Sequence, residues 1–83
     1  MLEQDRLVRE HLVRAGLGSV LIDVRTERGS GELTWAQIRS AKEIVTVEAV
    51  WSVDSSVESV ARELTEKARM HLSADDLPES RDE

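Results

Sequence analysis

The sequence predicts a small α+β domain in which a helix, a strand, a short helix, a second strand and a long helix follow one another. Two observations carry this prediction. Apolar and polar residues alternate over residues 43–53, as in a strand with one buried face. From Ser56 onward, apolar residues recur with the 3.6-residue period of an amphipathic helix. Between the two patterns, Ser55 and Glu58 have the spacing of a capping box, which marks the start of a helix.

The first helix is predicted over residues 2–15. No Gly or Pro interrupts this segment, and Val8, Leu12 and Ala15 recur at the i, i+4, i+7 spacing of one helical face. Two glycines follow within three residues and are expected to end the helix.

The apolar arc of this helix is wider than one small sheet should need to cover. Leu7 and Val13 lie well away from the stripe formed by the other apolar residues. Either the helix is partly exposed, or a second chain packs on the extra apolar face. The second interpretation predicts association between chains.

The first strand is predicted over residues 19–27, where Val20, Ile22 and Val24 alternate with their neighbours. The Arg-Gly-Ser-Gly sequence at residues 28–31 then predicts a turn. This turn lacks both the G-x-G-x-x-G pattern and a following Lys-Ser/Thr pair, so we do not expect a phosphate-binding loop.

Residues 33–42 admit two interpretations. Thr34 and Gln37 have capping-box spacing and lie within a hydrophobic staple, which favours a short helix beginning at Trp35. A β-hairpin is the alternative, because two glycines separate two strand-like runs and because Thr and Trp favour sheets. The short helix is preferred, since residues 36–42 show no clean alternation. If the hairpin forms instead, the fold becomes α-β-β-β-α with a three-stranded meander.

The last helix is predicted over residues 56–72 and should pack on the sheet. Glu58 with Arg62, and Glu63 with Lys67, are spaced for i, i+4 ion pairs on its solvent side. Its apolar residues form one stripe, which consists of Val57, Val60, Ala61, Leu64, Ala68 and Leu72.

The chain ends in an acidic tail. Residues 73–83 hold five carboxylates against Arg81, so they contribute −4 of the net charge of −6. Because no apolar residue follows Leu77, the tail has nothing to bury and is expected to be disordered. We therefore predict a single α+β domain over residues 1–72 and a disordered acidic tail over residues 73–83.

Length and composition exclude several classes of protein. A chain of 83 residues forms one small domain with a thin core, and without Cys neither disulfides nor thiolate-bound metals can reinforce that core. No run approaches the ~20 apolar residues of a membrane-spanning helix, so we expect a cytoplasmic protein without a membrane partner. Arg outnumbers Lys nine to two, which indicates a GC-rich genome and suits a prokaryotic or phage-type protein.

No motif predicts catalysis or cofactor binding. His11 and His71 are the only histidines, and no third ligand or HExxH spacing accompanies them, so no metal is expected. Asp23 and Glu48 could form a carboxylate pair on neighbouring strands, but acid–base catalysis needs a pocket that so small a sheet should not provide. The serines lack the sequence context of a nucleophile elbow. We therefore expect no enzyme, no catalytic residue and no cofactor.

The leading functional hypothesis is a small protein-interaction or assembly module that acts as a homodimer or as a subunit of a larger complex. Two strands alone are marginal in water, and their unpaired edges invite pairing with another copy of the sheet. Such association would also cover the extra apolar arc of the first helix. The residues expected at the interface are Leu7, Val13, Leu21, Ile44 and Val50.

The alternative hypothesis is a small nucleic-acid-binding regulator. A mild basic patch, formed by Arg25, Arg28, Arg39 and Lys42, is its only support. The acidic balance of the chain disfavours contact with phosphates, and no predicted helix presents several basic side chains on one face. Nucleic acid is therefore the less favoured partner.

Overall fold

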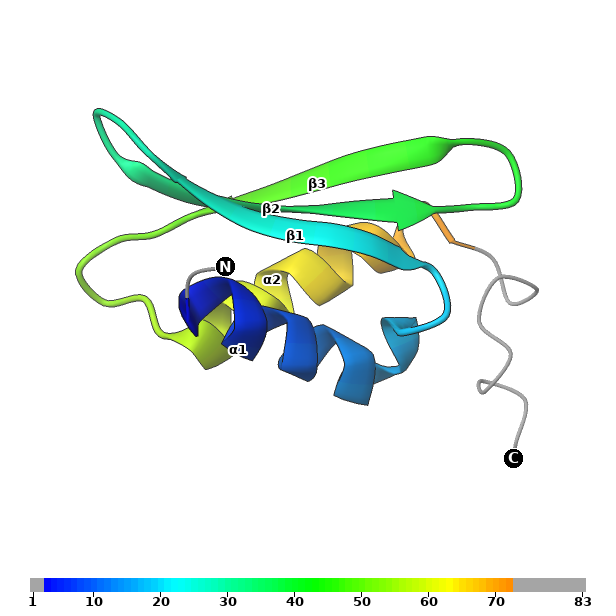
Figure 1. The fold of residues 1–83 in the computed structure, drawn as a ribbon, viewed down its shortest axis with the longest axis horizontal. Helices are drawn as coiled ribbons and strands as arrows, with labels where there is room; N and C mark the ends of the chain where they lie inside the picture. The colour runs from blue at the N-terminus through cyan, green and yellow to red at the C-terminus, as the bar shows by residue number, and fades with distance from the viewer. Residues whose placement is uncertain (1–2, 73–83) are drawn as a thin grey trace.

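The structure, a computed structural model, describes residues 3–72 as two layers, with a three-stranded antiparallel sheet above two helices (Figure 1). The strands form a meander in the order β1-β2-β3, so the predicted small α+β domain is confirmed in its α-β-β-β-α form. The disorder predicted for residues 73–83 lies outside the described residues. In chain order the elements are α1 (Glu3–Leu12), the π-helical turn η1 (Val13–Leu17), β1 (Leu21–Arg28), β2 (Glu32–Arg39), β3 (Ile44–Val50) and α2 (Val57–Arg69).

The preferred prediction of a short helix over residues 33–42 is wrong, because this segment contains β2, the central strand of the sheet. Thr34, Ala36 and Ile38 alternate along β2 and are at most 1% exposed. The strand is hydrogen-bonded to β1 on one side and to β3 on the other, and this pairing outweighs the local capping signals. The hydroxyl of Thr34, which the capping box assigned to a helix start, instead accepts a hydrogen bond from the indole N–H of Trp51.

The first helix ends earlier than predicted. α1 ends at Leu12, and the chain continues through η1 to Leu17. Within η1, Gly16 has a φ of 95°, a left-handed conformation that glycine adopts without the steric cost a side chain would bring. Beyond this glycine the chain returns to the core, where Leu17 is fully buried.

The last helix begins on a capping box, one residue later than predicted. The hydroxyl of Ser56 accepts a hydrogen bond from the backbone N–H of Ser59 at 3.1 Å. In return, the hydroxyl of Ser59 accepts one from the backbone N–H of Ser56 at 2.9 Å. Ser55, the predicted cap, instead accepts a hydrogen bond from the backbone N–H of Ser52 in the preceding loop. The two reciprocal bonds satisfy backbone donors at the start of α2 that would otherwise lack partners.

The core lies between the sheet and the two helices. α1 packs mainly under β1, and α2 under β3 and β2. The alternation predicted over residues 43–53 is present in β3, but the strand ends at Val50, and Val53 lies in the following loop and is 100% exposed. The buried apolar side chains are Val8, Leu12, Leu17, Val20, Val24, Ala36, Ile38, Val47, Ala49, Val60, Ala61, Leu64 and Ala68.

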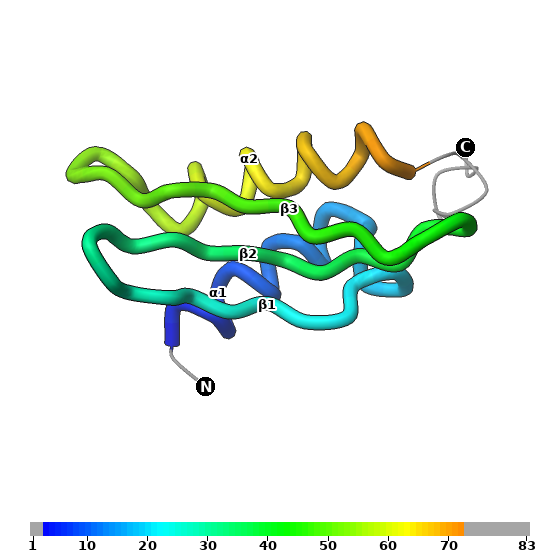
Figure 2. Tube along the Cα trace, turned by 90° about the horizontal axis from the view of Figure 1, so that it is seen from above, coloured from blue at the N-terminus to red at the C-terminus, as the bar shows by residue number. Residues whose placement is uncertain are grey.

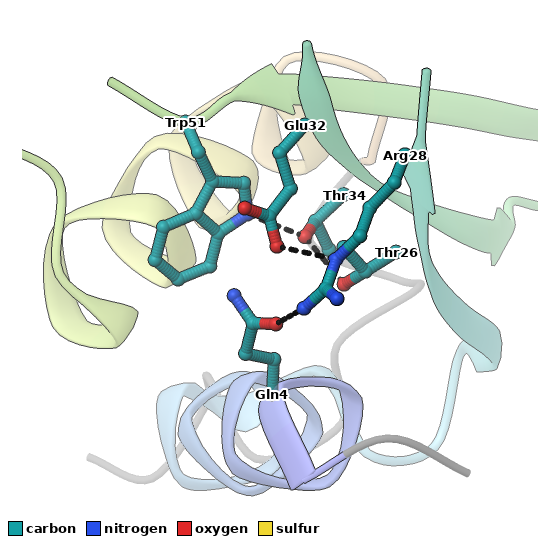
Figure 3. A network of polar contacts seen from close by, with 6 residues as sticks. All are labelled: Gln4, Thr26, Arg28, Glu32, Thr34 and Trp51. Carbon is teal, nitrogen blue, oxygen red and sulfur yellow. Dashed lines mark hydrogen bonds and ion pairs between the residues drawn. The ribbon is translucent and has the colours of Figure 1, made fainter. Parts of the chain in front are cut away.

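Polar contacts close one end of this core (Figure 3). Thr34 is fully buried, and its hydroxyl oxygen lies 2.7 Å from the indole nitrogen of Trp51 and 2.8 Å from the hydroxyl of Thr26. Nearby, Arg28 donates to the carboxylate of Glu32 in the next strand and to the side-chain amide oxygen of Gln4 in α1. These contacts fix the β1–β2 hairpin against the start of α1. They also hold Trp51 on the helical side of the sheet.

Candidate interaction surface

Both helices lie on the same side of the sheet, so the opposite side is bare of any described element (Figures 1 and 2). We call this side the open face. Alternation along the strands and their burial patterns determine which side chains it carries. These are Asp23, Arg25 and Glu27 from β1, Leu33, Trp35, Gln37 and Arg39 from β2, and Ile44, Thr46, Glu48 and Val50 from β3.

The open face has an apolar component. Val50 is 67% exposed and Ile44 is 57% exposed, although both belong to regular β3. Leu33 and Trp35 are half-buried in the central strand, next to β3. Large apolar side chains that gather on one face of a small domain are typical of an interaction surface.

The strand register arranges the open face in rows across the sheet. Leu33 lies between Glu27 and Val50, and Trp35 lies between Arg25 and Glu48. The indole N–H of Trp35 donates to the carboxylate of Glu27 at 3.1 Å, which orients the ring toward the row of Leu33. Shallow hollows lie beside these side chains. The surface is therefore broad and shallow, a shape that suits another protein surface better than a small substrate.

The outer edge of β3 is partly occupied by a lysine from α2. The backbone N–H of Trp51 donates to the carbonyl of Glu32, and that of Ser40 donates to the carbonyl of Glu43. The backbone N–H and C=O groups of odd-numbered β3 residues therefore point toward β2, and those of even-numbered residues point toward the free edge. Glu48 is one of the latter. Its carbonyl accepts a hydrogen bond of 2.6 Å from the ammonium of Lys67, which also pairs with Glu63 at 2.9 Å.

The outer edge of β1 is occupied in a similar way by a carboxylate. The backbone N–H of Gly29 donates to the carbonyl of Gly31, so odd-numbered residues of β1 direct their backbone groups toward β2. The backbone N–H of Val24 therefore points to the free edge. Asp23 accepts that N–H at 2.9 Å and also pairs with Arg9 of α1 at 3.6 Å. Side chains at both edges thus compete with the backbone of an added strand, a common protection against edge pairing.

The five residues predicted at an interface do not form one surface. Ile44 and Val50 lie at opposite ends of β3 on the open face. Val13, in η1, is 49% exposed on the helical layer, and Leu7 is half-buried on α1. Leu21 packs against the core. The structure therefore places only the two residues of β3 on the open face, and it adds Leu33 and Trp35 to that face.

The four basic residues of the alternative hypothesis are also dispersed. Arg25 lies on the open face and pairs with Asp23 at 3.4 Å, whereas Arg28 points to the helical side. Arg39 lies at the last position of β2, and Lys42 lies in the turn that follows. On the open face, two arginines face two glutamates and Asp23, so the side chains there carry no excess of positive charge.

The structure separates the candidate chemical groups. Asp23 and Glu48, expected on neighbouring strands, lie on the two edge strands with β2 between them. His11 lines a groove between α1 and α2 together with small and charged side chains. Within residues 3–72, no three His, Asp or Glu side chains gather closely enough to hold a metal ion. None of the helices described is long and apolar enough to cross a membrane.

Comparison with known proteins does not assign this chain to a family. No family model, curated protein or solved structure matches this chain. The features of this chain that bear on function are therefore the open face and the two edges of the sheet.

Proposed function

We propose that this protein is a non-catalytic assembly module, and that it forms a homodimer by stacking the open faces of two sheets. The observation that carries the proposal is the open face itself. Four large apolar side chains lie there, in a fold whose helices both cover the other side of the sheet. Stacking two such faces would produce a sandwich with a second apolar layer, about 10 Å thick.

The occupied edges favour stacking of faces over pairing of edges. Lys67 holds the carbonyl of Glu48 at one edge, and Asp23 holds the N–H of Val24 at the other. A strand added at either edge would have to displace an intramolecular hydrogen bond to a charged group, which costs more than displacing a neutral one. The open face requires no such displacement.

A matched pair of substitutions tests this proposal. Val50→Asp places a charge on the open face, and Val53→Asp places the same charge in a loop only three residues away. Sedimentation equilibrium should give a mass of two chains for the wild type and for Val53→Asp, and a mass of one chain for Val50→Asp. Circular dichroism checks that both variants fold. If Val50→Asp keeps the wild-type mass, the open face is not the interface.

Nucleic-acid binding remains the second hypothesis, and the same samples separate it from dimerisation. Its basic residues lie on different faces, and two of them already pair with carboxylates. Retention on heparin that falls steeply with salt and is abolished by Arg25→Ala with Arg39→Ala would support it. A chain that passes through heparin at low salt would exclude it.

A further inference from the structure

The charges on the open face are arranged so that they complement a second copy in one orientation. The middle row reads Arg25, Trp35 and Glu48, with the cation on one edge strand and the anion on the other. We propose that two copies of this chain stack about a twofold axis parallel to β2, and that Arg25 of each copy pairs with Glu48 of the other. This inference rests on the proposed homodimer and specifies its geometry.

The orientation follows from the symmetry of stacked sheets. A twofold axis between the two sheets and parallel to β2 exchanges left and right, so β1 of one copy lies over β3 of the other. Rows stay in register, because the rotation leaves positions along the strand unchanged. Arg25 then faces Glu48, and by symmetry a second identical pair forms on the other side of Trp35.

The same rotation places the apolar side chains of β2 on the axis, whereas Val50 of β3 lies over Glu27 of the other copy. Residues of β2 face their own copies, so Trp35 meets Trp35 and Leu33 meets Leu33. The two ion pairs flank this apolar centre on both sides. Arg39 also faces its own copy, but it is exposed at the last position of β2, where solvent and salt weaken the repulsion between the two guanidinium groups.

Twofold axes that run across the strands, perpendicular to β2, pair opposite charges of the two copies less well. An axis along the middle row places Arg25 over Arg25 and Glu48 over Glu48, which is repulsive at both edges. An axis shifted toward the next row pairs Arg25 with Glu27 of the other copy. That glutamate already accepts the indole N–H of Trp35, whereas no described residue pairs with the side chain of Glu48.

The size of the face predicts a dimer that dissociates on dilution. Three strands spaced about 4.8 Å apart, with seven or eight residues each at about 3.3 Å per residue, give a face of roughly 14 Å by 25 Å. Such a face, about 350 Å² on each copy, is smaller than a standard specific interface and falls in the size range of weak, transient complexes. We therefore expect a dissociation constant on the order of micromolar.

Two charge reversals and their mixture test the orientation. Arg25→Glu alone and Glu48→Arg alone should each weaken the dimer by about tenfold or more, because each replaces two attractive pairs with two repulsive ones. An equimolar mixture of the two variants should form a heterodimer of nearly wild-type affinity, since both cross-chain pairs are then Glu with Arg. Sedimentation equilibrium of the mixture measures this recovery.

Control variants keep the outcome decisive. In a mixture of Arg25→Glu with Glu27→Arg, the heterodimer keeps only one of the two Arg25–Glu48 pairs, so its affinity should stay well below that of the wild type. A heterodimer of nearly wild-type affinity would overturn the proposed axis in favour of the shifted one. If Arg25→Glu does not fold, Glu48→Arg must still weaken the dimer by about tenfold, and Glu27→Arg by less than about threefold. A larger loss of dimer affinity for Glu27→Arg than for Glu48→Arg would overturn the proposal.

The outcomes also distinguish this inference from the proposed function. A dimer that Val50→Asp dissociates, but that the mixture of Arg25→Glu and Glu48→Arg does not restore, leaves the open-face homodimer standing and removes the orientation. A wild type that stays a single chain removes both.

Discussion

Thr34 is the residue whose role differs most from its local sequence signal. Its hydroxyl is the shared partner of the Trp51 indole and of Thr26, beside a cluster of buried aliphatic side chains. Its side chain is fully buried, so no water replaces these partners when the hydroxyl is removed. Thr34 therefore contributes buried hydrogen bonds to the stability of the fold, in addition to its place in strand β2.

Replacing Thr34 with Val should therefore destabilise the fold although the shape is kept. The change leaves the indole N–H of Trp51 and the hydroxyl of Thr26 without their partner, at a cost of about 1–3 kcal/mol. Urea unfolding followed by far-ultraviolet circular dichroism measures the difference. The matched control is Thr46→Val, an exposed position on β3, which should change the free energy of unfolding by less than about 0.5 kcal/mol. Equal effects at both positions would contradict the assigned role of Thr34.

We expect Lys67 to have a different role, namely to protect the edge of the sheet more than to stabilise α2. Lys67→Met keeps the apolar stem and removes the ammonium that holds the carbonyl of Glu48. We expect little change in thermal unfolding but faster growth of light scattering on incubation, since an exposed edge pairs with other chains. Lys42→Met, at the only other lysine and in a turn, is the control and should behave like the wild type. Unchanged scattering for Lys67→Met would contradict edge protection.

Among the elements, η1 depends most on a single backbone conformation. Gly16 has the only positive φ within residues 3–72, and a Cβ built there meets no atom within 4 Å. The cost of a side chain at this position therefore comes from the backbone alone. That conformation connects α1 to Leu17 and the start of β1.

Replacing Gly16 with Ala should destabilise the fold by about 1–2 kcal/mol, the cost of a left-handed conformation for a residue with a side chain. Gly29→Ala is the control, because its φ is not positive and it also has open space around the added Cβ. We expect the control to change the free energy of unfolding by less than about 0.5 kcal/mol. Thermal unfolding monitored by circular dichroism compares the two, and a larger loss at Gly29 would contradict the account of η1.

The elements also differ in how far the sequence could predict them. The last helix and β3 were predictable, because each shows one period over many residues. β2 was predictable only as the alternative, because its alternation of Thr34, Ala36 and Ile38 uses a polar and a small residue on the buried face, and hydrophobicity alone does not mark them as buried. Only the pairing with two neighbouring strands decides its conformation.

The candidate surface was predictable only in part, for the same reason. Ile44 and Val50 follow from the alternation of β3, whereas Leu33 and Trp35 join them only once β2 is a strand. Lys67 and Asp23 at the edges could not be identified without the strand order. Leu21, which was also predicted at the interface, is partly buried and packs against the core.

For the whole molecule, the decisive property is the asymmetry of its two layers. One side of the sheet is covered by α1 and α2, and the other side carries apolar and charged side chains in register with no described element above them (Figure 2). With both edges of the sheet engaged by its own side chains, the open face is the surface on which a partner can be added without breaking the fold. In the proposed dimer, each chain therefore supplies one of the two stacked sheets.

The mass of the wild-type protein in solution as a function of concentration tests this central claim most directly. Sedimentation equilibrium from about 1 μM to about 500 μM spans the dissociation constant expected for so small an interface. The account predicts a reversible rise from the mass of one chain to that of two, with no larger species. A mass of one chain over the whole range would contradict it.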